Sequence, residues 1–166
     1  RCDAGTYIRT LCIHMGYALG VSAHMQELRR IRSGPFDETT AVSLHELADA
    51  VAAAQEGDPG PLRWMILPPG AAVADLPKVV IRDTAVDAVC HGAVLAGVGI
   101  TGKEGGFAKG ETVAIVTGRG ELVGLGKALV GSPALKPGEP GLVVAPTTVL
   151  MQPGTYPRGW KARGRS

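Results

Sequence analysis

The sequence predicts an α+β chain in which a mixed helical and extended first part precedes a small β-barrel with short helices. Residues 6–19 carry apolar side chains at helical spacing. After residue 76, short apolar runs alternate with glycine-rich turns, as in a small mixed barrel. The chain has 166 residues with 45% hydrophobic content, enough to bury a core in one domain or two small ones. We therefore expect regions 1–75 and 76–152, followed by a basic tail over 153–166.

The first region opens with a predicted helix over residues 6–19. Thr6 can cap its start and Gly20 its end. Residues 21–32 favour a strand, which Ser33-Gly34-Pro35 would break. Because side chains alternate along a strand, three would share one face: Leu28, Arg30 and Arg32.

A second helix is predicted later in this region. Ser43 and Glu46 have the spacing of a capping box, and an alanine-rich run continues to Gln55. Glycine and proline concentrate at 57–61 and 68–70, so loops are expected there.

The second region alternates short strands with turns. A short helix capped by Asp83 or Thr84 should run to His91, and the glycines of 97–110 should mark loops. Strands are predicted at 78–82, 112–116, 121–130 and 142–151.

Composition excludes several classes of protein. Three cysteines without CxxC spacing indicate a reducing compartment and no disulfide framework. Four histidines lack metal-ligand spacing, so we expect no metal. No apolar run reaches the roughly 18 residues of a membrane span, and no signal peptide is visible. The chain opens on Arg1 rather than Met and is interpreted as a piece of something longer.

Positive charge is clustered rather than abundant. The net charge of +2 is too small to indicate a nucleic-acid partner by itself. Two clusters stand out, at Arg29, Arg30 and Arg32, and at Arg158, Lys161, Arg163 and Arg165.

Arg9 is the most informative single residue. It is the only formally charged side chain between Asp3 and Glu27. On a helix, its neighbours three and four residues away cannot neutralise it: Gly5, Thr6, Cys12 and Ile13. The guanidinium therefore either reaches water along a buried stem or meets a carboxylate from elsewhere.

Two long motifs carry a resemblance to a known family. Residues 2–11, CDAGTYIRTL, and residues 23–36, AHMQELRRIRSGPF, closely resemble signatures of the TruB/dyskerin family of RNA pseudouridine synthases. The second region resembles a PUA RNA-binding domain through LPKVVIRDTAVDAVCHGA, KGETVAIV and GELVGLGKA. Residues 156–160, YPRGW, are similar to the end of dyskerin-type members. The resemblance implies the C-terminal part of a catalytic domain followed by a PUA domain, of the archaeal guide-RNA type.

The resemblance also implies an activity and partners. The family isomerises uridine to pseudouridine in rRNA or tRNA without cofactor, using an aspartate on a flipped-out base. That aspartate belongs to a motif N-terminal to these residues, and Asp3 does not match it, so this piece alone is expected to be inactive. The implied partners are the RNA substrate, an H/ACA guide RNA and the small protein subunits of the H/ACA ribonucleoprotein. The implied location is the cytoplasm for an archaeal protein and the nucleolus for a eukaryotic one.

Three residues match the catalytic machinery of the family. Arg9 matches the arginine that pairs with the catalytic aspartate, which would keep that carboxylate oriented and ionised. Tyr7 matches the active-site tyrosine, with a core aromatic as the alternative. Leu28 matches the apolar residue that packs on the flipped base, with an ordinary core contact as the alternative.

Further residues match positions that contact RNA. Arg29, Arg30 and Arg32 could meet phosphates, or they could form a solvated strand face. Gly92 and Ala93 match small residues that let an RNA end approach the backbone, although Gly92 could be an ordinary helix-ending glycine. His91 receives no role.

Two other functions stay open. The same chemistry could act on free tRNA without a guide RNA. Alternatively, the chain could be a noncatalytic RNA-binding module that uses only its barrel. A pure binding module has no need of Arg9, Tyr7 and Leu28, so the enzyme reading is favoured.

Overall fold

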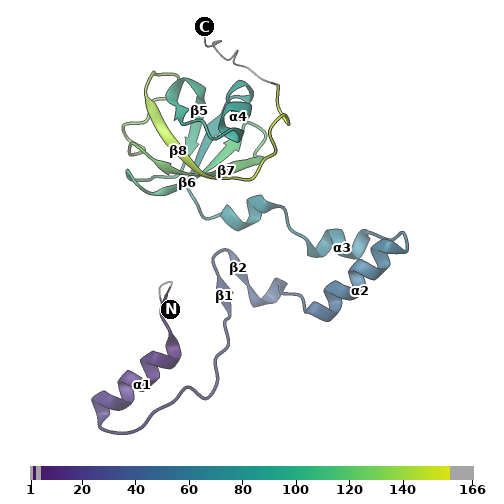
Figure 1. Ribbon diagram of the computed structural model, residues 1–166, viewed down its shortest axis with the longest axis vertical. Coiled ribbons are helices and arrows are strands. Elements are labelled where there is room, and N and C mark those ends of the chain that lie inside the picture. Colours follow the sequence, from purple (N-terminus) through teal and green to yellow (C-terminus); the bar gives the residue numbers. More distant parts are fainter. Residues whose placement is uncertain (1, 3–4, 158–166) are drawn as a thin grey trace. The chain divides into compact units, whose positions relative to one another are not determined.

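The computed structural model describes residues 2 and 5–157, and the chain divides into two compact units, Arg1–Ala41 and Val42–Ser166 (Figure 1). It is a mixed helical and strand structure with a curled sheet, which confirms the predicted α+β class. The boundary expected near residue 76 stays a prediction. The expected basic tail lies outside the described residues from 158 onward.

The first unit begins with helix α1 (Ile8–Leu19). The predicted cap at Thr6 is wrong, because Tyr7 occupies the N-cap and no side chain caps the helix. Gly20 ends the helix as predicted, in the left-handed conformation at φ 70°. The chain then turns back onto buried Gly16, where an added Cβ would lie 2.8 Å from the Cβ of Ala23.

The strand predicted over residues 21–32 is wrong. Only β1 (Arg32–Ser33) forms at its end, paired antiparallel with β2 (Phe36–Asp37). A strand needs a neighbour for its N–H and C=O groups. In the described part of the chain no strand pairs with residues 21–31, so Leu28, Arg30 and Arg32 do not share a strand face.

The first unit ends with the 3-10 turn η1 (Glu38–Thr40). The second unit begins with helix α2 (Leu44–Gln55). Its capping box is confirmed: the Glu46 N–H donates to Ser43 Oγ at 3.2 Å, and the Ser43 N–H donates to Glu46 Oε2 at 2.7 Å.

The two loops predicted after α2 are only partly correct. Helix α3 (Gly60–Met65) begins inside the first of them, and the 3-10 helix η2 (Pro69–Val73) begins inside the second. Proline is tolerated in the first turn of a helix, where its missing N–H costs nothing. The same prolines that suggested loops therefore open helical turns.

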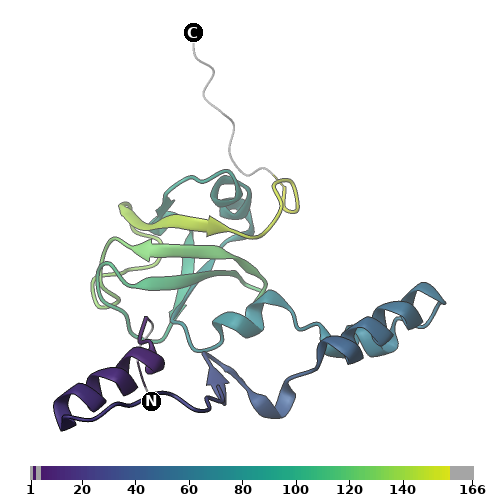
Figure 2. The same ribbon diagram turned by 60° about the horizontal axis from the view of Figure 1, so that its bottom comes forward.

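The barrel is a six-stranded sheet that curls on itself (Figure 2). Strands β3 and β6 pair in parallel and all other neighbours pair antiparallel, in the order β4-β8-β7-β6-β3-β5. The strands are β3 (Lys78–Ile81), β4 (Leu95–Ala96), β5 (Ile100–Glu104), β6 (Thr112–Thr117), β7 (Leu122–Ala128) and β8 (Leu142–Val149).

Helix α4 (Asp83–Cys90) and β5 depart from the expected pattern. The helix is confirmed, but its N-cap is Arg82 rather than Asp83 or Thr84, and no side chain caps it. Strand β5 lies inside the expected loop 97–110, after the 3-10 turn η3 (Gly97–Gly99). Gly102 made this segment resemble a loop in the sequence. In the structure, the backbone N–H and C=O groups of β5 pair with those of β3.

The main core lies inside the curled sheet. It contains alternate residues of the strands together with α4, and its fully buried members include Val79, Ile81, Val86, Val89, Val113, Ile115, Val123 and Val144. A smaller cluster on the outer face joins Val73 of η2 to Ala114 and Val116 of β6. The η2 turn therefore packs on the barrel that follows it.

Residues 150–157, here called the strap, return to the barrel after β8. The N–H groups of Leu150 and Met151 both donate to the Val123 carbonyl at 3.0 Å. Further along, Tyr156 is buried and packs in the main core. The strap thus belongs to the folded barrel.

Candidate functional site

The predicted catalytic residues of the first unit lie on its surface. The Tyr7 side chain is 78% exposed, and Leu28 is 58% exposed. Arg9 is also exposed, and within the described part of the chain its guanidinium forms no hydrogen bond or ion pair. Tyr7, Arg9 and Leu28 therefore do not form an active site on their own in this structure. Their catalytic roles stay predictions.

Apolar exposure is a general property of this unit. Tyr17 and Leu19 on α1 and Ile31 before β1 are all largely exposed. Soluble monomers rarely leave so many large apolar side chains uncovered. This unit therefore leaves much of its apolar surface uncovered.

The arginine cluster forms local contacts. The Arg29 Nε lies 2.6 Å from Glu38 Oε2, and the Arg32 Nε donates to the Gly34 carbonyl at 2.9 Å. All three arginines are exposed. Their phosphate contacts stay a prediction. The exposed ion pair between Arg29 and Glu38 is weak, so a phosphate could replace Glu38 as the partner of Arg29.

Gly92 and Ala93 form the turn that ends α4. The Gly92 N–H donates to the Val89 carbonyl at 2.8 Å, and the Ala93 N–H donates to the Ala88 carbonyl at 3.0 Å, which is a Schellman motif. Gly92 has a φ of +82°, so it does serve as a helix-ending glycine. Both residues are also exposed, and no heavy atom lies within 4 Å of a Cβ built on Gly92. A ligand can therefore approach the backbone here.

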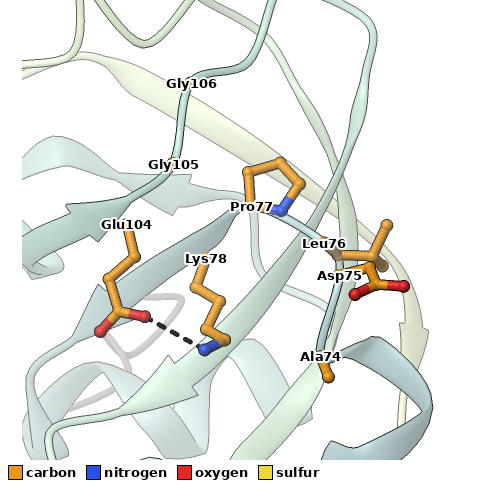
Figure 3. Close-up of a pocket in the computed structure, with 8 residues that line it drawn as sticks. All are labelled: Ala74, Asp75, Leu76, Pro77, Lys78, Glu104, Gly105 and Gly106. Atoms are coloured by element: carbon orange, nitrogen blue, oxygen red, sulfur yellow. Dashed lines mark hydrogen bonds and ion pairs between the residues drawn. The ribbon is translucent and has the colours of Figure 1, made fainter. Parts of the chain in front are cut away.

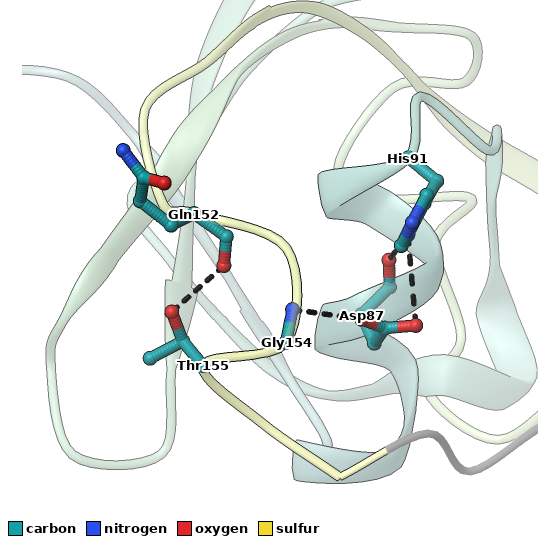
Figure 4. A network of polar contacts seen from close by, with 5 residues as sticks. All are labelled: Asp87, His91, Gln152, Gly154 and Thr155. Carbon is teal, nitrogen blue, oxygen red and sulfur yellow. Dashed lines mark hydrogen bonds and ion pairs between the residues drawn. The ribbon is translucent and has the colours of Figure 1, made fainter.

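A polar network that the sequence analysis did not identify lies behind this turn (Figure 4). Asp87 of α4 is buried, and its Oδ1 accepts the Gly154 N–H of the strap at 3.1 Å. His91 Nδ1 lies 2.8 Å from the Asp87 carbonyl oxygen and 3.5 Å from Asp87 Oδ2. The signal that could have found it is an Asp on the apolar face of a short helix with a His four residues later.

A second polar contact holds the end of the strap. The Tyr156 hydroxyl donates to Glu121 Oε2, and the Thr117 hydroxyl donates to the same oxygen at 3.1 Å. These hydrogen bonds, the one from Tyr156 foremost, lower the pKa of the Glu121 carboxyl. The bond to Glu121, assisted by desolvation, raises the pKa of Tyr156. The strap is therefore fastened at both Asp87 and Glu121.

One surface hollow lies beside β3 and β5 (Figure 3). It is lined by residues 74–78 and 104–106, and the Lys78 Nζ lies 3.1 Å from Glu104 Oε2. Lys78 and Glu104 thus pair with each other, and a third charged residue, Asp75, lines the same hollow. Across the described residues there is no cluster of side chains that could hold a metal ion. In the same part of the chain, no helix is both long and apolar enough to cross a bilayer.

Comparison with known families matches both regions. A family described as the tRNA pseudouridylate synthase B C-terminal domain matches residues 9–74, and the PUA domain family matches residues 77–150. The chain joins a domain of the pseudouridine synthase B family to a PUA domain. This confirms the resemblance read from the two motifs and the barrel.

Individual relatives agree with the family match. The chain is 49% identical over 166 residues to "Probable tRNA pseudouridine synthase B" of Methanosarcina acetivorans, covering 99% of this chain and 49% of that protein. It is 51% identical over 161 residues to the protein of the same name from Methanothermobacter thermautotrophicus, covering 96% of this chain and 50% of that protein. The chain thus spans about half the length of the curated relatives it matches.

Solved structures extend the agreement to three dimensions. The chain is similar to the archaeal box H/ACA sRNP Nop10-Cbf5 complex with a TM-score of 0.86 and 46% identity, covering 95% of this chain and 51% of that one. It is equally similar to an H/ACA RNP bound to a substrate RNA containing 2'-deoxyuridine, with a TM-score of 0.85 and 47% identity, covering 95% of this chain and 50% of that one.

Proposed function

We propose that this chain provides the Arg9 half of the active site and the RNA-binding barrel of a guide-RNA-dependent RNA pseudouridine synthase. Similarity to two H/ACA structures over 95% of the chain, at 46–47% identity, carries the proposal. The reaction cleaves the N-glycosidic bond of uridine, turns the uracil and rejoins it through carbon. We expect rRNA or tRNA as substrate, a guide RNA and small ribonucleoprotein subunits as partners, and the cytoplasm as location.

The proposed role of Arg9 is to clamp the catalytic aspartate. Its guanidinium is exposed on α1 and has no side-chain partner in the described residues, so it is available to a carboxylate from outside them. A bidentate Arg–carboxylate pair fixes the geometry of the carboxylate and keeps it charged. Tyr7, directly before α1, and Leu28, after it, would contact the flipped base from the same unit.

The proposed role of the barrel is to hold the RNA end. The backbone at Gly92 and Ala93 is open, and a flat base or a phosphate can approach it because no side chain projects from Gly92. The cationic cluster at Arg29, Arg30 and Arg32 would add phosphate contacts from the first unit.

One runner-up function is favoured by a specific observation. The curated relatives are named as tRNA pseudouridine synthases, so the enzyme could act on free tRNA without a guide. RNA that co-purifies with the protein separates the two, since a guided enzyme carries guide RNA and an unguided one carries tRNA.

The experiment that tests the enzyme proposal compares the chain with and without the matching N-terminal half of a relative. Each preparation is incubated with substrate RNA and guide RNA, and pseudouridine is quantified. We expect none from the chain alone and turnover when the half that carries the aspartate is supplied. Turnover by the chain alone would show that its nucleophile lies among the present residues, and none from the combination would reject the enzyme proposal.

A further inference from the structure

The last turn of α4 holds a histidine with no assigned role beside the proposed RNA-end site. His91 immediately precedes Gly92, and its side chain is 41% exposed. It is also the C-cap of α4, so it lies where the helix opens into the Gly92–Ala93 turn. An exposed imidazole at this place can reach a ligand that touches the turn.

The contacts of His91 decide which ring nitrogen is available. The carbonyl oxygen of Asp87, 2.8 Å from Nδ1, can only accept a hydrogen bond, so Nδ1 must carry the hydrogen. On a neutral ring, Nε2 then has a lone pair and repels an anion. On a charged ring, Nε2 carries a hydrogen and donates to one.

The surroundings supply a counter-charge for the charged ring. Asp87 Oδ2 lies 3.5 Å from Nδ1, and that carboxylate is fully buried. The Gly154 N–H of the strap donates to the other oxygen of the same carboxylate, and in the described part of the chain no other side chain is bonded to His91. The neighbouring Cys90 thiol adds no second negative charge beside His91. Burial, reinforced by the charge of Asp87, raises the pKa of this thiol and keeps it neutral between pH 6 and 8.

We propose that His91 is a phosphate contact for the RNA end that approaches Gly92 and Ala93, made by Nε2–H of the charged ring while Asp87 holds Nδ1. The inference rests on the proposed RNA-binding function of this turn. Its consequence is that RNA binding takes up a proton, so affinity is higher at lower pH.

The test measures the affinity of the full chain for a fluorescent RNA hairpin with a single-stranded 3′ tail, at pH 6 and pH 8 and at several salt concentrations. We expect the wild type to bind about 3- to 10-fold more tightly at pH 6, as one charge-assisted contact is gained. The log–log salt slope should steepen by about 0.7 at pH 6, the value for one further phosphate on a single strand.

Matched variants identify the histidine responsible. His91→Gln keeps the size and polarity of the side chain but cannot become charged, so it should lose both the gain in affinity and the steeper slope. His45→Gln removes an exposed histidine of α2 and should keep both. Asp87→Asn keeps the oxygen that accepts from Gly154 but removes the counter-charge, and it should reduce the gain provided that thermal unfolding shows an intact barrel.

Equal pH and salt dependence in wild type and His91→Gln would overturn the inference. In that case Gly92→Trp tells which idea failed. If Gly92→Trp still weakens binding, the RNA end does approach this turn and His91 only supports the fold. If it too has no effect, the RNA-end site itself is elsewhere.

Discussion

Replacing Gly92 by Trp should separate two jobs that this glycine performs. The first is conformational: at φ +82°, a residue with a Cβ is strained by roughly 1–2 kcal/mol. For a domain of 60–100 residues, each 1 kcal/mol lowers the Tm by about 4–8 °C. No heavy atom beyond the chain neighbours lies within 4 Å of the added Cβ, so the Cβ itself adds no clash to that strain. The second job is to leave the backbone open to RNA, where losing one stacked base would weaken binding at least about fivefold.

Two control variants separate the effect of backbone strain on the Tm from the effect of side-chain bulk on RNA binding. Gly92→Ala carries the same strain without the bulk, so it should lower the Tm but bind RNA within about twofold of wild type. Gly120→Trp carries bulk and strain at another turn: Gly120 has a φ of +81°, donates its N–H to the Thr117 carbonyl at 3.0 Å and is equally open. It should lower the Tm by a similar amount and leave RNA affinity unchanged.

The assay is fluorescence anisotropy with hairpins that carry or lack a single-stranded 3′ tail, together with thermal unfolding of each variant. The reasoning requires a weaker affinity for the tailed hairpin only in Gly92→Trp. If Gly92→Trp and Gly120→Trp bind tailed RNA equally well, Gly92 is a helix-ending glycine and nothing more. If Gly92→Ala weakens binding as much as Gly92→Trp, strain rather than access explains the loss.

Three further predictions concern the active site and the strap. With the N-terminal half supplied, Arg9→Lys should lower the single-turnover rate at least about 100-fold with RNA affinity unchanged, because an ammonium cannot make the bidentate contact; a normal rate would reject the clamp. A barrel that begins at residue 76 and ends at Met151 should unfold at lower urea than one that ends at Pro157, because only the longer one buries Tyr156, and equal midpoints would show the strap to be dispensable. The lowered pKa of Glu121 means that its hydrogen bond stabilises the fold above the ordinary carboxyl pKa and is lost as the pH falls through the lowered value. Acid unfolding followed by circular dichroism should thus show a smaller pH dependence in Tyr156→Phe, and an unchanged profile would mean that this bond adds no stability.

Local sequence determined the features that depend on a few neighbouring residues. The capping box of Ser43 and Glu46 and the helix end at Gly20 involve contacts over at most four residues, so their side chains and backbone preferences suffice. The short apolar runs of β6, β7 and β8, separated by glycine-containing turns, likewise predicted strands, since such runs are typical of buried strands. The two motifs around Arg9 and Leu28 indicated the family for the same reason, because they are contiguous in the chain.

Tertiary structure decided whatever depends on a distant partner. Residues 21–31 have an apolar alternation, yet no strand forms because no described segment pairs with them. Strand β5 has a weak pattern and a glycine, yet it forms because β3 offers its edge. The contact between Asp87 and Gly154 joins residues 67 positions apart, and that between Tyr156 and Glu121 joins residues 35 apart. Such contacts follow from the closure of the barrel, and no local preference of the chain encodes them.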